Sequence, residues 1–191
     1  MQFQSTTDRE IIRNIVTHPA IWPHVSDDFS GEPEVWEPPI GDGFLYILAL
    51  EAGEIRAMWM FEKTSPILFK VHTTVLPVGR GVWANEAAKK MAFWIWEHTE
   101  CQRIVTDVPE NNRLALKFAE AAGMQQFGVN PKSYQKGGKL LGVILLGLSR
   151  PQHEPHSHSA IAAGQVSQNE SQIHSAEAAS HPLTASCSGH N

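Results

Sequence analysis

Short apolar runs separated by turn residues fill the first 150 positions, and their spacing predicts a mixed α/β domain. Four apolar residues of segment 7–18 recur at helical spacing, and Pro19 ends the predicted helix. Segment 20–43 is rich in proline and glycine and predicts a long irregular connection. The runs 44–50 and 55–61 flank a glycine-containing turn, which predicts an antiparallel β-hairpin.

The centre of the chain alternates strand and helix patterns. Segments 67–76 and 103–108 predict strands, and 84–98 and 112–122 predict helices that follow them. A helical connection between two strands favours their parallel pairing. The residues predicted to be buried are Ala84, Ala87 or Ala88, Met91 and Ile95 on the first helix, and Leu114, Ala115, Phe118 and Ala122 on the second.

The last part of the body predicts two more strands, 124–129 and 140–148, around a turn at Gly137–Gly138. The expected architecture is a mixed sheet that begins antiparallel and has a parallel centre. Segments 20–43 and 128–138 are irregular, and loops of this kind commonly carry the specificity of a site.

A sharp change of composition after Arg150 predicts two regions, a domain at 1–150 and a tail at 151–191. The tail contains no Lys, Arg or aromatic residue, and it holds eight Ser and six of the ten His. Such a segment buries too little apolar area to offset its ordering entropy, so we expect a disordered tail. Metal binding by His153, His156 and His158 is an alternative for it, and a piece that folds on a partner is another.

Overall charge and cysteine content exclude several classes of protein. The net charge of −5 and the absence of a Lys/Arg run disfavour nucleic-acid binding. Apolar runs are far shorter than the roughly 20 residues that span a bilayer, and the polar N-terminus does not resemble a secretory signal. Cys101 and Cys187 form neither a disulfide framework nor a zinc spacing, so no metal and a reducing cytoplasm are expected.

The turn between the strand 67–76 and the helix 84–98 has features of an anion site. Free N–H groups and the helix dipole at such a junction favour a phosphate. Gly79 and Gly81 allow close approach of a ligand to the backbone, and Arg80 adds a positive charge. A plain tight turn is the alternative interpretation.

The order of these elements and two motifs resemble the GNAT (Gcn5-related) N-acetyltransferases. Arg80–Asn85 resembles the family's pyrophosphate loop, Arg/Gln-x-x-Gly-x-Gly/Ala, although Trp83 replaces its first glycine and Asn85 its last Gly/Ala. Asn112-x-x-Ala115 with Phe118 and Gly123 resembles the pattern of a later helix of the family. The resemblance implies a GNAT-like acyl-CoA N-acyltransferase fold with acetyl-CoA as co-substrate. The implied cofactor-binding residues are Val75, Leu76, Gly79, Arg80, Gly81, Val82, Trp83, Ala84, Asn112, Ala115 and Phe118.

The opening of the chain and residues 108–150 are similar to the branch of ribosomal-protein N-terminal acetyltransferases. The chain also resembles phage-encoded GNAT-like proteins, which would imply a phage or host protein partner. Asn112 is equally suited to cap its helix. Ala119 takes the position where many members of the superfamily have a tyrosine that acts as general acid, and Trp83 would either fill the cofactor path or point into the core.

Acetyl transfer to an amine needs a base, and His72 and Glu62 are the candidates on the central strands. His72 has a suitable intrinsic pKa, but a histidine hydrogen-bonded for structural reasons is the alternative. Glu62 could instead pair with Lys63 or Arg80 at the surface. Tyr134, beside Ser133, lies in a loop that could approach the departing thiolate.

Two functions follow from the resemblance. The first is an acetyl-CoA-dependent N-acetyltransferase that acts on an amine of a small molecule or protein. The second is a GNAT-like scaffold without catalysis, and an unrelated α/β binding domain is a third interpretation. A cofactor site predicts a V-shaped splay between strands 67–76 and 103–108, whereas a closed gap filled by Trp83 would favour the scaffold. The sequence does not predict the acceptor or the oligomeric state.

Overall fold

The computed structural model describes residues 1–152, which form one compact unit. Its strands are β1 (Gln2–Thr6), β2 (Phe44–Glu51), β3 (Glu54–Ser65), β4 (Leu68–Val75), β5 (Arg103–Pro109), β6 (Gln125–Lys136) and β7 (Lys139–Ser149). Its α-helices are α1 (Arg9–Val16), α2 (Trp22–Val25), α3 (Val82–His98) and α4 (Arg113–Ala121), and its 3-10 turns are η1 (Pro33–Val35) and η2 (Pro77–Gly79). The predicted α/β class is confirmed.

All seven strands belong to one sheet, in the order β1-β2-β3-β4-β5-β7-β6. Every neighbouring pair is antiparallel except β4 and β5, which are parallel as predicted. The short edge strand β1 was not predicted, because its sequence QFQST has no apolar alternation beyond Phe3. It pairs with β2, so its backbone rather than its side chains holds it in place.

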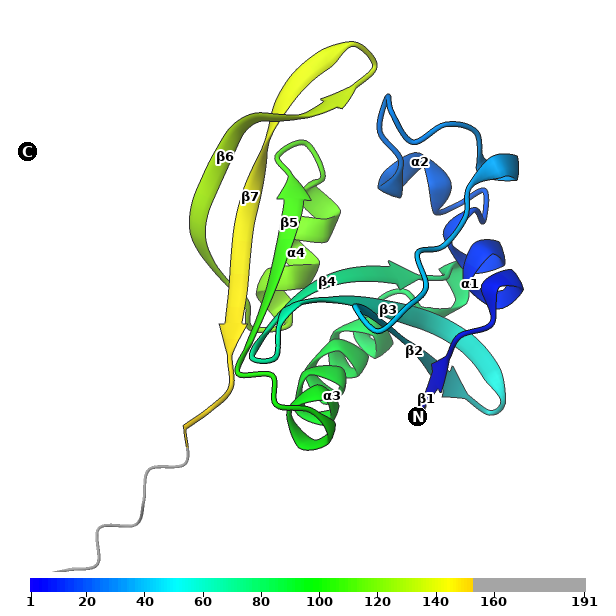
Figure 1. Ribbon diagram of the computed structural model, residues 1–191, viewed down its shortest axis with the longest axis vertical. Helices are drawn as coiled ribbons and strands as arrows, with labels where there is room; N and C mark the ends of the chain where they lie inside the picture. Colours follow the sequence, from blue (N-terminus) through cyan, green and yellow to red (C-terminus); the bar gives the residue numbers. More distant parts are fainter. Residues whose placement is uncertain (153–191) are drawn as a thin grey trace, which may run out of the picture. The chain divides into compact units, whose positions relative to one another are not determined.

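Both faces of the first half of the sheet are covered, which explains why β2 is apolar throughout. Ile47 and Ala49 pack in the core that α3 covers, and the alternate residues Tyr46 and Leu48 pack in the core formed with α1. Figure 1 shows α3 on one face of β2, β3 and β4, with α1 and α2 on the other. Trp22 and Trp36 of the long connection meet edge to face at 6.3 Å, and Trp36 packs against the core formed with α1.

Helix α3 confirms the predicted buried stripe and begins two residues earlier than predicted. Its buried residues include Ala84, Ala87, Ala88, Met91 and Ile95. Gly81 precedes the helix with φ 89°, a conformation that favours glycine, and so the helix begins at Val82. Trp96 is buried, while Trp94 lies at the edge and stacks on His98.

The buried face of helix α4 differs from the one predicted. Leu114, predicted to be buried, is 80% exposed, and Leu116 and Ala119 are buried instead. These two residues pack against Val108 of β5 and Leu146 of β7. Contact with these two strands decides which face of α4 is buried. The spacing of apolar residues within the helical segment carries no information about that contact.

The β6–β7 hairpin is longer than predicted. Its turn is at Gly137 and Gly138, with φ 59° and 72°, as predicted. Segment 128–138, predicted to be irregular, mostly continues β6 as far as Lys136. A register shift between Asn130 and Tyr134 absorbs Pro131, because a bulge frees a residue from the ladder.

Two further predictions concern the tail and the absence of a membrane-spanning segment. The tail beyond residue 152, with the metal alternative at His153, His156 and His158, lies outside the described residues. Within residues 1–152, no helix has the length and apolar character needed to cross a membrane.

Candidate functional site

Strands β4 and β5 separate soon after they begin to pair. Their parallel register contains only Leu68 with Arg103, Phe69 with Ile104 and Lys70 with Val105. Beyond this point β4 runs on to Val75, while β5 continues to Pro109 alongside β7. Thr106 sits at the vertex, where its hydroxyl donates to the carbonyl of Val71 at 2.9 Å. The predicted V-shaped splay is therefore present.

The splay leaves free backbone groups on β4. The Val71 carbonyl points to the β5 side, and strand alternation directs the N–H groups of Thr73 and Val75 the same way. Past Lys70 there is no β5 residue in register with them. By contrast, the N–H of Leu76 donates to the carbonyl of Arg56 at 2.9 Å. Of Val75 and Leu76, both implied to bind the cofactor, Val75 thus directs its N–H to the β5 side, whereas the N–H of Leu76 is already bonded.

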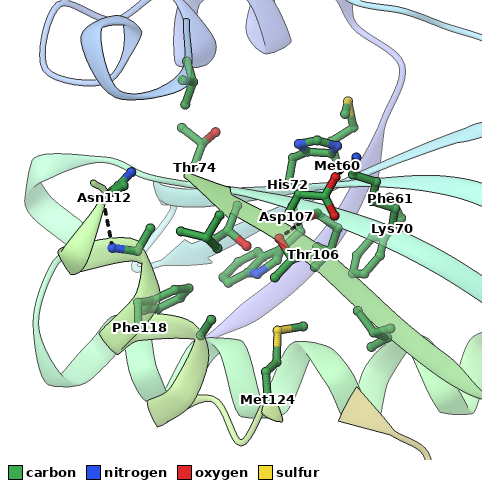
Figure 2. A pocket seen from close by; sticks show the side chains of 18 of the residues that line it. Met60, Phe61, Lys70, His72, Thr74, Thr106, Asp107, Asn112, Phe118 and Met124 are labelled. Carbon is green, nitrogen blue, oxygen red and sulfur yellow. Dashed lines mark hydrogen bonds and ion pairs between the residues drawn. The ribbon is translucent and has the colours of Figure 1, made fainter. Parts of the chain in front are cut away.

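A cavity of about 570 Å³ occupies the splay. Its walls come from α3 and α4 at one end and from α1, α2 and the β6–β7 hairpin at the other. Figure 2 shows Asn112 and Phe118 of α4 to one side, with His72 and Asp107 facing the same space. The cavity is large enough for part of an extended ligand and reaches titratable groups, which is the usual character of an active-site pocket.

Three polar side chains meet in this cavity. Lys70 and His72 lie on one face of β4, and Asp107 extends from β5. The Nζ of Lys70 is 2.5 Å from Oδ2 of Asp107, so the two strands are joined by an ion pair just beyond their last ladder position. The polar end of the cleft thus contains an imidazole next to a neutralised charge pair.

His72 is an exposed residue on β4 whose surroundings lower the pKa of its imidazole. Desolvation by the cleft walls lowers its pKa below the ordinary value, and the Lys70 ammonium lowers it further. Glu62 and Asp107 act in the opposite direction without overcoming this effect. A histidine that is unprotonated near neutral pH can accept a proton from an amine.

Glu62, the other predicted base, is outside the cavity. It lies opposite Lys70 in the β3–β4 register, and its side chain is exposed. Among the described residues it forms no ion pair, with Lys63 and Arg80 included. The structure therefore brings His72 and Tyr134 into the cavity wall but leaves Glu62 on the neighbouring strand.

Tyr134 lines the cavity from the hairpin, and its hydroxyl donates to the carbonyl of Ser26 at 2.9 Å. Burial raises its pKa, and Asp27 and Asp28 raise it further. Ser133 lies beside it on the cavity wall. Tyr134 is consequently a neutral phenol whose proton is engaged with the opposite side of the cleft.

The residues of the predicted pyrophosphate turn, from Gly79 to Ala84, do not line the cavity. Arg80 extends to the long connection, where its Nη2 donates to the carbonyl of Ala20 at 3.0 Å. Val82 and Trp83 occupy the first turn of α3, where N–H groups lack intrahelical acceptors. The turn is therefore at the start of α3, outside the enclosed part of the site.

Trp83 points into the core. It packs against the main core cluster, and the guanidinium of Arg56 lies 5.7 Å from its ring centroid. Its Nε1 is buried without a hydrogen-bond partner. Of the two positions considered for this side chain, the core position is the one observed, and the cleft is free of it.

The residues predicted on α4 do line the cavity. Asn112 caps the helix by accepting from the N–H of Ala115 at 3.1 Å, and Asn112, Ala115 and Phe118 all contribute to the wall. The cap and the cleft position are thus compatible. Ala119, at the expected tyrosine position, also lines the cavity and brings no hydroxyl to it.

Lys70 and Asp107 were missed by reasoning from the sequence. Each is a charged residue inside a strand that is otherwise apolar, LFKVHTTV or RIVTDVP. A charge in a central strand is unusual and is the signal that could have identified them. Their pairing depends on the β4–β5 contact, which does not follow from either segment alone.

Gly79 supports the turn, and its replacement tests this role. An added Cβ would lie 2.5 Å from the carbonyl oxygen of Arg56. We expect Gly79→Ala to lower the free energy of unfolding by about 1–3 kcal/mol, because the clash is with backbone. Gly43→Ala, at a site with open space, is the control. Equal urea midpoints for the two variants would contradict this role.

Solved structures with this architecture are acetyltransferases. The ribosomal-protein-S5-alanine acetyltransferase from Vibrio fischeri matches with a TM-score of 0.61 at 14% identity, over 81% of this chain and 97% of that one. The spermidine N-acetyltransferase from Vibrio cholerae, solved with CoA and spermine, matches with a TM-score of 0.61 at 11% identity, over 78% and 95%. The ribosomal-protein-alanine N-acetyltransferase from Brucella melitensis gives 0.57 at 12% identity, over 78% and 100%.

The fold is GNAT-like, as the resemblance of the sequence implied. Residues 39–158 match the family described as protein of unknown function (DUF2824), and the chain belongs to this family. No curated protein matches the sequence significantly. The narrower resemblance to phage-encoded proteins stays a prediction.

Proposed function

We propose that this protein is an N-acetyltransferase that takes its acetyl group from acetyl-CoA and transfers it to an amine. The observation that carries the proposal is the cavity in the β4–β5 splay, which joins free backbone donors on β4 to a neutral imidazole. The likeness to solved N-acetyltransferases supports it at the level of the fold.

The described residues fit a CoA thioester on its donor side. The free N–H groups of Thr73 and Val75 can complete a ladder with the amides of an extended pantetheine arm. The first turn of α3 offers N–H groups and a helix dipole to phosphate, and Arg80 adds charge beside it. Acetyl-CoA would supply a thioester carbonyl whose developing negative charge a β4 amide can stabilise.

The acceptor end of the cleft supplies the proton transfer. His72 removes a proton from the acceptor ammonium, and the freed lone pair of the amine forms the new C–N bond as the C–S bond breaks. Asp107, held by Lys70, places a carboxylate near the developing imidazolium that partly offsets the opposing effect of the Lys70 ammonium. The departing sulfur takes up one proton, for which Tyr134 is the candidate phenol on the opposite wall. The nitrogen gives up its second proton as the amide forms, and this proton replaces the one lost by the phenol, so that only the proton held by His72 is released overall.

Binding of acetyl-CoA tests the proposal directly. At 100 times its Kd, a ligand of the folded state adds about 2.7 kcal/mol to stability, so thermal denaturation should move to higher temperature. ATP at the same concentration is the control, because it has the adenosine and phosphates without the pantetheine arm. No thermal shift with millimolar acetyl-CoA, or an equal shift with ATP, would contradict the proposed enzyme function.

A non-catalytic scaffold is the second candidate, and one contact favours it. Arg80, the charged residue of the predicted pyrophosphate loop, is bonded to Ala20 of the long connection. If that contact persists in solution, Arg80 serves the packing of the fold. The scaffold function predicts unchanged melting temperature with acetyl-CoA and no acetylated product from any amine.

A further inference from the structure

The two sides of the cleft are tied together at one end. Segment 23–28, which contains part of α2, is bonded to the tip of the β6–β7 hairpin, and we call this contact the clasp. Figure 1 shows the hairpin tip and α2 at the same end of the domain. The bonds of the clasp run from Gly137 and Gly138 N–H to Asp28, from Tyr134 to Ser26, from Lys136 to Pro23 and Ser26, and between Gln135 and Asp28 in both directions.

Asp28 is the centre of the clasp. Its two carboxylate oxygens accept from the N–H groups of Gly137 and Gly138 at 2.6 and 2.8 Å. Both glycines have positive φ, so this turn presents two adjacent N–H groups to one carboxylate. Its own N–H donates to the carbonyl of Gln135 at 3.1 Å. The hydrogen bonds from Gly138 and Gly137 lower the pKa of Asp28.

The clasp joins the α2 segment to the β6–β7 hairpin across the acceptor end of the cleft. Residues from both of its sides line the cavity: Val25 and Asp27 from the α2 segment, and Asn130, Ser133 and Tyr134 from the hairpin. An acceptor amine that enters at this end passes between these residues before it reaches His72, an exposed side chain on β4. A flat or bulky surface, such as a loop of a folded protein, is hindered at this end while the clasp is formed.

The wall of this passage is mostly apolar. Val16, Trp36 and Met60 are half-buried and line it on the side of α1 and the long connection, whereas Met58 is 1% exposed and lies behind this surface. Tyr46 lines it as well, but its hydroxyl donates to the carbonyl of Pro39 at 2.7 Å, and burial raises its pKa to about 12. Such a surface binds a hydrocarbon body better than a charged or strongly hydrated one.

Few charges face this passage. Asp107 is already neutralised by Lys70, and Oδ1 of Asp27 accepts from Phe29 N–H and from the hydroxyl of Ser30. His24, Tyr46, His72 and Tyr134 are the remaining titratable groups on the wall. Asp27 and Asp107 are the acidic residues near an ammonium group of the acceptor. An acceptor with several ammonium groups would leave some of them without an acidic partner.

We propose that the acceptor is a slender primary amine with an apolar body, and that Asp28 determines this specificity by holding the clasp closed. The inference rests on the proposed acetyl transfer at His72. It adds the chemical class of the acceptor, and it assigns Asp28 a role in excluding bulky amines without contact to the reacting atoms.

Three amines distinguish the features of the passage. Hexylamine is slender and apolar, spermidine is slender but carries several charges, and 1-adamantylmethylamine is apolar but bulky. With the full chain and acetyl-CoA, we expect kcat/KM for hexylamine to exceed that for each of the others by at least about tenfold, measured as acetylated product by mass spectrometry. A preference for spermidine or for the adamantyl amine would overturn the inference.

Removal of the Asp28 carboxylate tests its role, because it deletes the bonds from Gly137, Gly138 and the Gln135 side chain while the other bonds of the clasp remain. We expect Asp28→Ala to raise the adamantyl-to-hexylamine ratio of kcat/KM by about tenfold, because the hairpin can move aside, and to leave spermidine poor. Asp42→Ala removes an exposed carboxylate elsewhere and should keep the wild-type ratio. An unchanged ratio in the Asp28 variant, with its melting curve still cooperative, would overturn the assignment.

Amine binding separates this inference from the proposed function. Calorimetry of each amine with the protein alone, and again with CoA, reports the passage without requiring turnover. Absence of acetyl-CoA binding would remove the proposed function, whereas bound acetyl-CoA with tighter binding of spermidine than hexylamine would remove only the acceptor class. Should Asp28→Ala fold poorly, Asp28→Asn, which keeps one acceptor oxygen, replaces it with a smaller expected change in the same direction.

Discussion

Replacing His72 by glutamine is expected to lower kcat for amine acetylation by about 10²–10⁴-fold. The substitution removes the group that accepts the proton, while the amide keeps a similar size and polarity on the cavity wall. Glu62→Gln is the matched control, because its side chain lies outside the cavity, and its kcat should change less than about twofold. Product formation at saturating acetyl-CoA measures both.

The pH dependence gives this prediction a second readout. The base must be neutral, and desolvation and Lys70 lower the pKa of His72. The acid limb of kcat/KM should therefore fall below the ordinary histidine pKa of about 6.5. The same shift weakens the folded state in acid: the unfolded chain binds the proton first, so stability present above the unfolded pKa is lost as pH falls through the folded pKa.

His72→Gln has to remove both effects together to support the assigned role. A variant that retains wild-type kcat would exclude His72 as the base. A variant that loses activity but keeps the acid limb would instead identify another titrating group, for which Asp107 is the neighbour in the cavity. Melting curves of the two proteins show whether a loss of activity reflects a loss of fold.

Phe61→Ala is expected to have the largest effect on stability, lowering the free energy of unfolding by about 3–5 kcal/mol. Phe61 is 1% exposed in the centre of β3, and its ring lies 6.4 Å from that of Phe69. Its removal would enlarge the existing cavity, because β-sheet backbone on both sides limits collapse.

Phe29→Ala provides the comparison for Phe61, since it removes the same atoms from a side chain that is 76% exposed. Its change should stay within about 0.5 kcal/mol. Urea denaturation measures both variants, and equal m-values are required for the midpoints to report stability. Similar midpoints for the two variants would contradict the packing described for β3.

Several features of the fold follow from local patterns in the sequence. The β2–β3 hairpin, the buried stripe of α3 and the Gly137–Gly138 turn were predicted, because alternation, helical spacing and glycine each act within a few residues. The strand–helix–strand order was enough to predict the parallel pairing of β4 and β5, and the resemblance implied the GNAT fold.

The site was predicted only where it depends on such local order. Asn112, Ala115 and Phe118 follow one another on a helix, and His72 is a polar residue in a central strand, so a single segment indicated each of them. The turn residues Gly79 to Ala84 were predicted from a motif, yet they lie outside the enclosed cavity. Trp83 shows the limit, since nothing in its segment decides between the core and the cleft.

The sequence by itself determined a mixed α/β domain with a glycine turn before a long helix and a histidine on the central sheet. The tertiary structure alone decided that Lys70 pairs with Asp107, that Trp83 packs beside Arg56, and that Asp28 joins the hairpin tip across the cleft. The physical reason is the separation of the residues along the sequence. Strand and helix patterns reflect neighbours two to four residues apart. These contacts join residues 27 to 110 positions apart, and whether such residues meet depends on how the strands splay.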